Sequence, residues 1–448
     1  MDEVLRPLGG MEYAYWLMDR AARTNFVFAV RVSPGVPEDA LDEAVALVQA
    51  RHPLARAAIA PDEKGLPVFA PCARPVEIRR RAAETGLDFH EAAIREMERE
   101  RDEMFPAGEG PLSRLAVILR ADGSEVLVFT FHHAAADARS AALYIKDVLE
   151  AADGVLKGER PVFPPVLETG PAESLFPPAH RGFRSLFRAL GWMAAVGFRK
   201  MVLKRYDFPA PEAFAPPHER RERHIIRVLG REETARARAA AKERGLSLHS
   251  LFCAAQLMAL AEACGRPAPG LVNLSLVDLR GRLDPPVAER ALNVLVSTVE
   301  SFHRVRPEAE AWDLAAEIHA ALLRGLSAGE PFTAMPWMCR LVRASAWRIP
   351  PNEAGARSML AQGEATRPRL SVVSNVGPLP IPKDFGAFSV SDAFFLVPLS
   401  GATSFGSGVA GFDSKTTWTF THSEPLVGRA LASRLADRSV EIFRGALS

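Results

Sequence analysis

Prolines concentrate in one stretch near the middle of the chain and limit what can fold as a unit. Ten of them lie between Pro161 and Pro217. A proline has no backbone N–H to donate and interrupts a helix or an inner strand, so this stretch is typical of a connection. The 448 residues are enough for two domains of roughly 150–250 residues each. We therefore predict an N-terminal domain over residues 1–160, a crossover over 161–222 and a C-terminal domain over 223–448.

The composition indicates a folded and nearly neutral protein. Hydrophobic residues make up 48% of the chain and charged residues 24%, which excludes a disordered or fibrous class. With 55 basic and 54 acidic side chains the formal net charge is +1. No overall field would then attract nucleic acid or anionic lipid, so we expect no nucleic-acid partner and only local basic attraction.

The cysteines and the N-terminus favour a cytoplasmic location. The four cysteines are widely spaced and indicate neither a zinc ribbon nor a disulfide framework; they are Cys72, Cys253, Cys264 and Cys339. The first residues lack the basic and apolar pattern of a secretory signal. Every apolar run is interrupted by Arg or Lys before it reaches the ~18 residues of a spanning helix. We expect a soluble protein, or one bound at a membrane surface.

The N-terminal part alternates between helix and strand patterns. Apolar residues at helical spacing predict a helix over 37–52, and a charged stretch predicts another over 88–103. Two apolar runs, 115–119 and 126–131, predict neighbouring core strands. A further helix is predicted over 139–150, shortly after the second of these strands.

The C-terminal part shows a similar mixture, which predicts an α/β domain. A strand is expected over 224–228, followed by two helices, 232–244 and 248–263, that break at Gly245. Further strands are expected over 272–277, 294–299 and 370–373, then a Gly/Pro loop and several strand-like runs up to Thr421, with helices over 311–326 and 425–446.

The strongest candidate for chemistry lies at a strand-to-helix junction. His132, His133 and Asp137 follow the run that ends at Phe131 and precede a predicted helix. A neutral imidazole, with an ordinary pKa near ~6.5, accepts a proton at physiological pH and is the commonest general base. The spacing of one histidine and one aspartate is common by chance, so the doubled histidines and their position carry the prediction.

Two other interpretations stay open for these residues. One of the histidines, His132 in particular, can be a core residue with satisfied polar atoms, while Asp137 is a helix-start carboxylate stabilised by the helix dipole. A metal site is disfavoured because no third ligand lies nearby in the sequence. We therefore expect no metal.

The run His132-His133-x-x-x-Asp137 resembles the HHxxxDG signature of the condensation-domain and chloramphenicol-acetyltransferase-like superfamily, which includes polyketide-associated and alcohol acyltransferases. Other landmarks of that superfamily occur in the same order along nearly the whole chain. They are Pro7-Leu8 with Glu12, the helix ending Arg51-His52-Pro53-Leu54, Gly110-Pro111-Leu112 before a strand, Val277-Asp278-Leu279-Arg280, and the SNxG-like Ser374-Asn375-Val376-Gly377.

The resemblance implies an α/β fold of two chloramphenicol-acetyltransferase-like domains with mixed β-sheets flanked by helices, meeting in a V around an active-site channel. By this likeness His133 would take the proton from an acceptor hydroxyl or amine as it attacks an acyl thioester, with His132 in support. Asp137 would be structural and pair with Arg280. Ser374, Asn375 and nearby backbone amides would be candidates to hold the oxyanion, with turn formation as the alternative for that loop.

Ala138 departs from the superfamily pattern, which has glycine after the aspartate. Glycine permits a positive φ or a close backbone approach, but alanine suits a position that already begins a helix. We expect a tolerated variation, with a catalytically degenerate site as the alternative.

Residues 406–411 match the pattern GxGxxG. A stretch rich in threonine and aromatic residues follows, where a dinucleotide site needs a helix. We therefore reject a nicotinamide site and predict a glycine loop between strands.

Residues 181–205 combine seven basic residues, no acidic residue, and apolar residues at helical spacing. This composition is typical of a helix at a membrane interface. The simpler alternative is a crossover helix whose apolar stripe packs on the protein itself. On the first interpretation the segment contacts membrane or guards the access of a lipid-like substrate.

Together these features predict a monomeric acyltransferase that forms an ester or amide. The acyl group would come from acyl-CoA or a phosphopantetheinyl acyl carrier protein and go to an alcohol or amine, with no tightly bound cofactor. Two alternatives remain: a degenerate protein that binds an acyl group or carrier without turnover, and amide-bond condensation on carrier-bound substrates supplied in trans.

Overall fold

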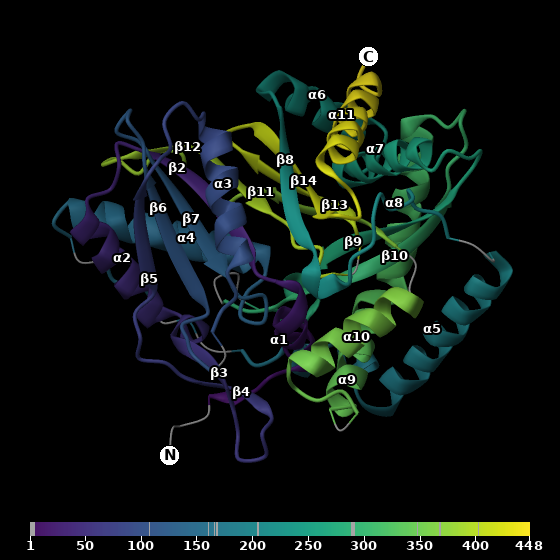
Figure 1. Ribbon diagram of the computed structural model, residues 1–448, viewed down its shortest axis with the longest axis horizontal. Coiled ribbons are helices and arrows are strands. Elements are labelled where there is room, and N and C mark those ends of the chain that lie inside the picture. The colour runs from purple at the N-terminus through teal and green to yellow at the C-terminus, as the bar shows by residue number, and fades with distance from the viewer. Residues whose placement is uncertain are drawn as a thin grey trace.

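The computed structural model describes residues 5–448 except 107, 160, 165, 167, 168, 204, 205, 288–291, 347, 367, 368 and 402. Two lobes lie side by side, each built on a mixed β-sheet with helices packed against it (Figure 1). This arrangement confirms the predicted α/β class. A small antiparallel sheet at the base of the first lobe contains β1 (Arg6–Pro7), β3 (Ala57–Pro61) and β4 (Pro67–Pro71).

The first lobe has a five-stranded sheet in the order β12-β2-β7-β6-β5. Its strands are β2 (Phe26–Ser33), β5 (Glu77–Ala82), β6 (Ser113–Leu119), β7 (Glu125–Phe131) and β12 (Ser389–Leu396). β5 and β6 are parallel, and the other neighbours are antiparallel. The two apolar runs near 115–119 and 126–131 are thus neighbouring strands, as predicted.

Both faces of this sheet are covered by helices. They are α1 (Gly10–Ala22), α2 (Glu38–Arg51), α3 (Phe89–Asp102) and α4 (Ala138–Leu156). Because side chains alternate along a strand, Phe26 and Phe28 join the core on the side of α1, α2 and α4, whereas Val27 and Ala29 join the core on the side of α3. The predicted helices over 37–52, 88–103 and 139–150 are confirmed, and α1 is an addition.

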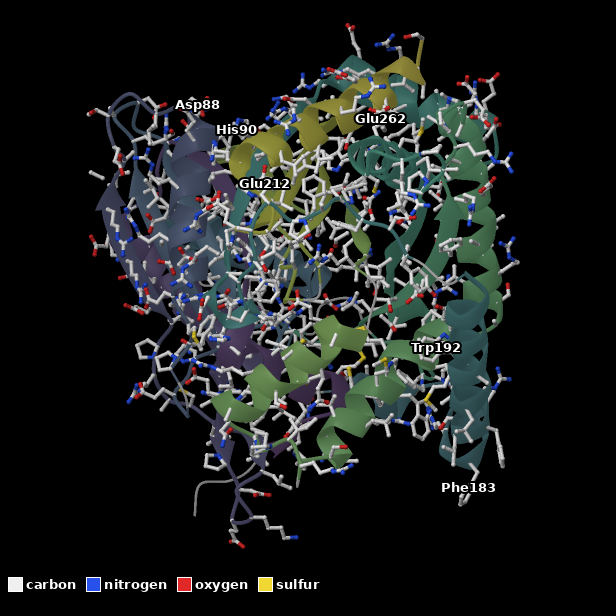
Figure 2. The ribbon with its side chains drawn as sticks, turned by 45° about the vertical axis from the view of Figure 1, so that its right-hand side comes forward. Asp88, His90, Phe183, Trp192, Glu212 and Glu262 are labelled. Carbon is white, nitrogen blue, oxygen red and sulfur yellow. The ribbon has the colours of Figure 1, made fainter. Side chains whose placement is uncertain are left out.

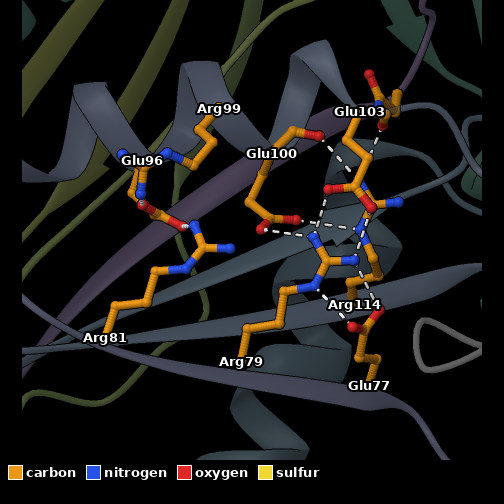
Figure 3. A network of polar contacts seen from close by, with 9 residues as sticks. Glu77, Arg79, Arg81, Glu96, Arg99, Glu100, Glu103 and Arg114 are labelled. Carbon is orange, nitrogen blue, oxygen red and sulfur yellow. Dashed lines mark hydrogen bonds and ion pairs between the residues drawn. The ribbon is translucent and has the colours of Figure 1, made fainter.

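An ion-pair network covers the outer edge of this sheet (Figure 3). The edge strand β5 has three consecutive arginines that alternate between its faces. Arg79 and Arg81 face α3, and Arg80 faces α2. Arg79 pairs with Glu77, Glu100 and Glu103, and Arg81 pairs with Glu96. Arg80 pairs with Glu38 and Asp42. A charged edge of this kind discourages pairing with a strand of another chain.

The second lobe has a six-stranded sheet in the order β10-β9-β11-β13-β14-β8. Its strands are β8 (Arg221–Leu229), β9 (Gly270–Asp278), β10 (Val296–Arg304), β11 (Ser371–Pro378), β13 (Phe405–Phe412) and β14 (Lys415–Glu424). β11 is parallel to both neighbours, and the other pairs are antiparallel. The strands predicted over 224–228, 272–277 and 294–299 correspond to β8, β9 and β10.

Helices α6 (Arg231–Glu243), α7 (Leu248–Ala263), α8 (Ala311–Ser327) and α11 (Arg429–Gly445) belong to this lobe. Phe252, Trp418 and Phe443 pack together in its core. Gly245, with a φ of 65°, lies between α6 and α7, which confirms the predicted break. Helices α9 (Ala334–Ala344) and α10 (Glu353–Thr366) instead pack against α1.

One loop predicted in the second lobe is wrong, and another begins later than predicted. The glycine loop over 406–411 is the inner strand β13, and the Gly/Pro loop expected after residue 373 follows β11, which continues to Pro378, and ends before β12. Gly408 shows why glycine is used in that strand. A Cβ there would lie 2.9 Å from the Thr419 Oγ1 atom and 3.1 Å from the Phe395 Cζ atom, so its absence allows β12 to approach β13 closely.

Strand β12 joins the two lobes. It comes from the C-terminal part of the chain, yet it pairs with β2 and completes the N-terminal sheet. The Thr419 hydroxyl of β14 donates to the Phe395 carbonyl at 2.9 Å, and the Thr421 hydroxyl donates to the Val397 carbonyl at 2.9 Å. The segment boundaries at 160 and 222 stay a prediction.

Helix α5 (Gly182–Leu203) lies within the proline-rich stretch of the chain, between its proline clusters, and runs along the outer margin of the molecule (Figure 1). It corresponds to the helix predicted over 181–205, of which residues 204 and 205 lie outside the described residues. In the part of the chain that the structure describes, no single helix is long and apolar enough to span a bilayer. Helices α6 and α7 taken together have the length and composition of a span, but they meet at a bend of 104°.

Candidate active site

The HHxxxD residues form a short loop between β7 and α4, at the contact between the lobes. The loop begins where the His132 N–H donates to the Leu112 carbonyl at 2.9 Å. It ends where the Asp137 N–H donates to the Asn293 carbonyl of the other lobe at 3.0 Å. Ala138 is the first residue of α4, so this position needs no glycine.

The ring of His133 is oriented by the backbone of its own loop. Its Nδ1 atom lies 3.0 Å from the Ala136 carbonyl oxygen. A carbonyl can only accept, so Nδ1 carries the hydrogen and Nε2 keeps its lone pair. Burial lowers the pKa of His133 to about 4, although the Ala136 carbonyl opposes the shift. The half-buried ring is therefore neutral near pH 7, and Nε2 can accept a proton.

Two aromatic side chains hold the plane of the His133 ring. Tyr15 of α1 stacks on it with ring centroids 3.9 Å apart and planes 14° apart, and Phe26 of β2 lies 5.0 Å away at a tilt. The sequence reasoning missed both residues. Aromatic residues in a helix or a strand usually serve the core, and nothing near Tyr15 or Phe26 in the sequence distinguishes them from that role.

His132 faces the interior. Its Nδ1 atom accepts from the Ala134 N–H at 3.0 Å, and its Nε2 atom lies 3.6 Å from the Asp19 Oδ2 atom. Burial lowers the pKa of this buried side chain. These contacts shape the loop, in keeping with the interpretation of His132 as a core residue; a supporting part in catalysis stays a prediction.

Asp137 binds donors from both lobes. One carboxylate oxygen accepts from the Ser140 N–H at 2.8 Å, which caps α4, and from the Arg280 guanidinium at 3.0 Å. The other accepts from the Leu295 N–H at 2.8 Å. Burial raises the pKa of Asp137, but Arg280 and the N–H donors outweigh it and lower the pKa overall. The ion pair expected from the sequence is present, and the carboxylate stays charged.

Arg280 is held in turn on the C-terminal side. It is a buried residue at the start of a short turn after β9, and its guanidinium also contacts the Asp278 carboxylate at 3.0 Å. Burial lowers the pKa of Arg280, but the two carboxylates raise it overall. The arginine is therefore charged, and it fixes the histidine loop to the second lobe.

Ser374 and Asn375 belong to strand β11. Ser374 is buried, and the Asn375 side-chain oxygen accepts from the Gly377 N–H at 2.9 Å where the pairing of β11 with β13 shifts register. The amide therefore stabilises a bulge in the strand. The contacts described here do not join either residue to His133, and their part in holding an oxyanion stays a prediction.

The described residues contain no group of three or more His, Cys, Asp or Glu side chains placed to hold a metal ion.

Comparison with known proteins gives matches in both halves of the chain. Residues 10–168 match the model of the condensation domain, and residues 219–397 match the model named phthiocerol/phthiodiolone dimycocerosyl transferase C-terminus. Phthiocerol/phthiodiolone dimycocerosyl transferase of Mycobacterium tuberculosis H37Rv is 28% identical over 223 residues, which are 49% of this chain and 51% of that protein. The chain spans about half the length of the curated relatives it matches.

Solved structures resemble nearly the whole chain. The first condensation domain of the calcium-dependent antibiotic synthetase has a TM-score of 0.75 at 18% identity, covering 98% of this chain and 96% of that one. Polyketide synthase associated protein 5 from Mycobacterium tuberculosis has a TM-score of 0.67 at 18% identity, covering 100% of this chain and 98% of that one. TRI3 trichothecene 15-O-acetyltransferase from Fusarium sporotrichioides has a TM-score of 0.71 at 13% identity, covering 98% of this chain and 94% of that one.

The chain therefore has the two-lobed fold of condensation domains and of chloramphenicol-acetyltransferase-like acyltransferases, and residues 10–168, which include His132, His133 and Asp137, match the condensation-domain model. Residues 219–397 are in addition similar to the C-terminal part of phthiocerol/phthiodiolone dimycocerosyl transferases.

Proposed function

We propose that this protein is an acyltransferase that moves an acyl group from a thioester to an alcohol or amine, with His133 as the general base. The orientation of His133 carries the proposal. Its Nδ1 atom is engaged by the Ala136 carbonyl, its Nε2 lone pair is free to accept a proton, and burial keeps the ring neutral.

In the proposed reaction the acceptor oxygen or nitrogen attacks the thioester carbonyl while Nε2 of His133 takes its proton. The carbon–sulfur bond breaks as the ester or amide bond forms, and His133 returns the proton to the departing sulfur. No covalent acyl-enzyme is needed, because the acceptor itself is the nucleophile. Asp137 and Arg280 act by holding the loop, and Ser374, Asn375 or backbone amides would hold the oxyanion.

The donor is proposed to be acyl-CoA or a phosphopantetheinyl acyl carrier protein, used by a monomer in a channel between the lobes. The names of the relatives favour an oxygen acceptor, because one is a 15-O-acetyltransferase and another a dimycocerosyl transferase of phthiocerol and phthiodiolone. A second candidate is amide formation on carrier-bound substrates in trans, which the likeness to a condensation domain of an antibiotic synthetase supports.

The test is acyl transfer from a mixed panel of acyl-CoA and acyl-carrier donors to alcohols and amines, with product masses read directly. His133→Ala should lower turnover by about 100-fold or more, the usual contribution of a general base. His218→Ala is the matched control, because this histidine lies far along the chain beside Glu219 and should leave turnover unchanged. A folded His133→Ala protein with wild-type turnover would refute the assignment, and tight donor binding by the wild type without any product would indicate a binding protein.

A further inference from the structure

Helix α5 packs on the protein through small side chains. Ser185 and Ala189, four residues apart on one face, are buried, and Trp192 on the same face is half-buried. Two arginines tie this segment to the protein: Arg181, just before the helix, donates to the Asp284 carbonyl at 2.9 Å, and Arg188, within it, donates to the Ala328 carbonyl at 3.5 Å. The inner face is therefore already occupied, although it uses few apolar groups.

The large apolar side chains of α5 point away from the protein. Phe183, Phe187, Leu190 and Met193 are spaced by three or four residues and share one face. They are 80%, 71%, 49% and 41% exposed. Figure 2 shows α5 at the margin of the molecule, with Phe183 at its outer end. The sequence left open that this apolar stripe packs on the protein itself. These four side chains do not, because they are exposed.

The segment that contains α5 is also strongly basic. Residues 181–205 contain seven basic and no acidic residues, in a chain whose overall charge is only +1. The helix has 22 residues and is about 33 Å long. A segment that combines an exposed apolar stripe with a net positive charge is suited to the surface of a membrane that contains anionic lipid.

We propose that α5 is a docking helix for the surface of an anionic lipid bilayer. Phe183, Phe187, Leu190 and Met193 enter the acyl boundary, and the net positive charge of the segment attracts it to lipid phosphates. A bilayer is favoured over a protein partner because it takes in a continuous apolar stripe without a matching groove. The proposal is independent of acyl transfer, because binding to vesicles is measured without turnover.

The experiment is co-sedimentation of the full-length protein with phosphatidylcholine vesicles, with and without phosphatidylglycerol. The test variant is Phe187→Ser/Leu190→Ser. Its matched control is Phe214→Ser/Leu323→Ser, because these residues are 71% and 50% exposed elsewhere on the surface. Both pairs are exposed, so both variants should fold. We expect the wild type and the control to bind vesicles containing phosphatidylglycerol, the α5 variant to bind about tenfold more weakly or worse, and high salt to weaken all binding.

Three results would overturn the proposal. The wild type fails to bind anionic vesicles, or the two double variants lose binding equally. The third result is that vesicle binding is unchanged by the α5 substitutions, while they convert an oligomer to a monomer or abolish binding to an acidic acyl carrier protein. That result would make this face a protein interface.

Discussion

At the scale of single residues, the candidate site depends on how His133 is held. The Ala136 carbonyl sets its tautomer and the Tyr15 ring sets its plane. Burial makes the charged form unfavourable, so the ring is neutral over the range in which most enzymes work. The same burial that makes His133 a proton acceptor also predicts how activity depends on pH.

We predict that acid inactivation begins far below the ordinary pKa of histidine. The base must be neutral, and the pKa of His133 is about 4 in the folded protein. Activity due to this group is therefore present above that pKa and is lost as pH falls through it. The ratio kcat/KM, measured from pH 8 down to the lowest pH at which the protein stays folded, should show no inflection near ~6.5. An inflection centred there would contradict the burial of the ring.

Tyr15 is predicted to position His133 through its ring and not through its hydroxyl. Tyr15→Phe keeps the stack and should leave kcat within about twofold of the wild type, whereas Tyr15→Leu should lower kcat about two- to tenfold, since an aromatic pair contributes about 0.5–1.5 kcal/mol. Tyr13→Leu is the control, because Tyr13 is also buried in α1 but contacts the Trp16 ring, with centroids 5.7 Å apart and planes tilted by 50°. If both leucine variants reduce kcat equally, Tyr15 has only a structural role.

At the scale of elements, the start of α4 is where local and long-range signals meet. Asp137 caps the helix through Ser140, a contact that short-range sequence rules anticipate. The same carboxylate accepts from Leu295 and pairs with Arg280, more than 140 residues away in the chain. One side chain thus fixes both the beginning of a helix and the position of that helix against the other lobe.

We predict that Asp137→Ala destabilises the protein by about 3–5 kcal/mol, because it removes the buried partner of the Arg280 charge, leaves only the partly exposed Asp278 carboxylate beside it, and takes the acceptor from the Leu295 N–H. Asp137→Ala/Arg280→Met should recover part of that loss, since it removes both charges together. The midpoints of denaturant unfolding for the two single variants and the double variant measure the coupling. If the loss of stability in the double variant equals the sum of the losses in the two single variants, the interaction between Asp137 and Arg280 does not stabilise the fold.

At the scale of the whole molecule, the lobes are not independent. β12 supplies the last strand of the N-terminal sheet, and hydroxyls of β14 bind backbone carbonyls in and just after β12. At the neighbouring strand β8, Arg101 of α3 contacts Glu222 at 2.6 Å, and His224 lies 3.2 Å from Glu98 of α3. Each sheet is therefore stabilised by residues of the other half.

We predict that residues 1–222 expressed alone do not fold into a stable monomer. Without β12, the edge of β2 is open, and β2 is rich in large apolar side chains that promote edge-to-edge aggregation. Light scattering and thermal unfolding of the fragment should show aggregates and no cooperative transition, while co-expression with residues 223–448 should restore a soluble complex. A monomeric fragment with a cooperative transition would show that β12 is dispensable.

The sequence alone determined what depends on near neighbours: the helices around α2, α3 and α7, the adjacent strands β6 and β7, the break at Gly245 and the histidine loop. Periodicity and capping act over a few residues, so they can be recognised in the sequence without a structure. Only the tertiary structure decided the placement of β12 beside β2, the use of the glycines of β13 as an inner strand, the stack of Tyr15 on His133 and the outward face of α5. These features depend on which distant surfaces meet, and a glycine or an aromatic residue has the same local signature in either setting.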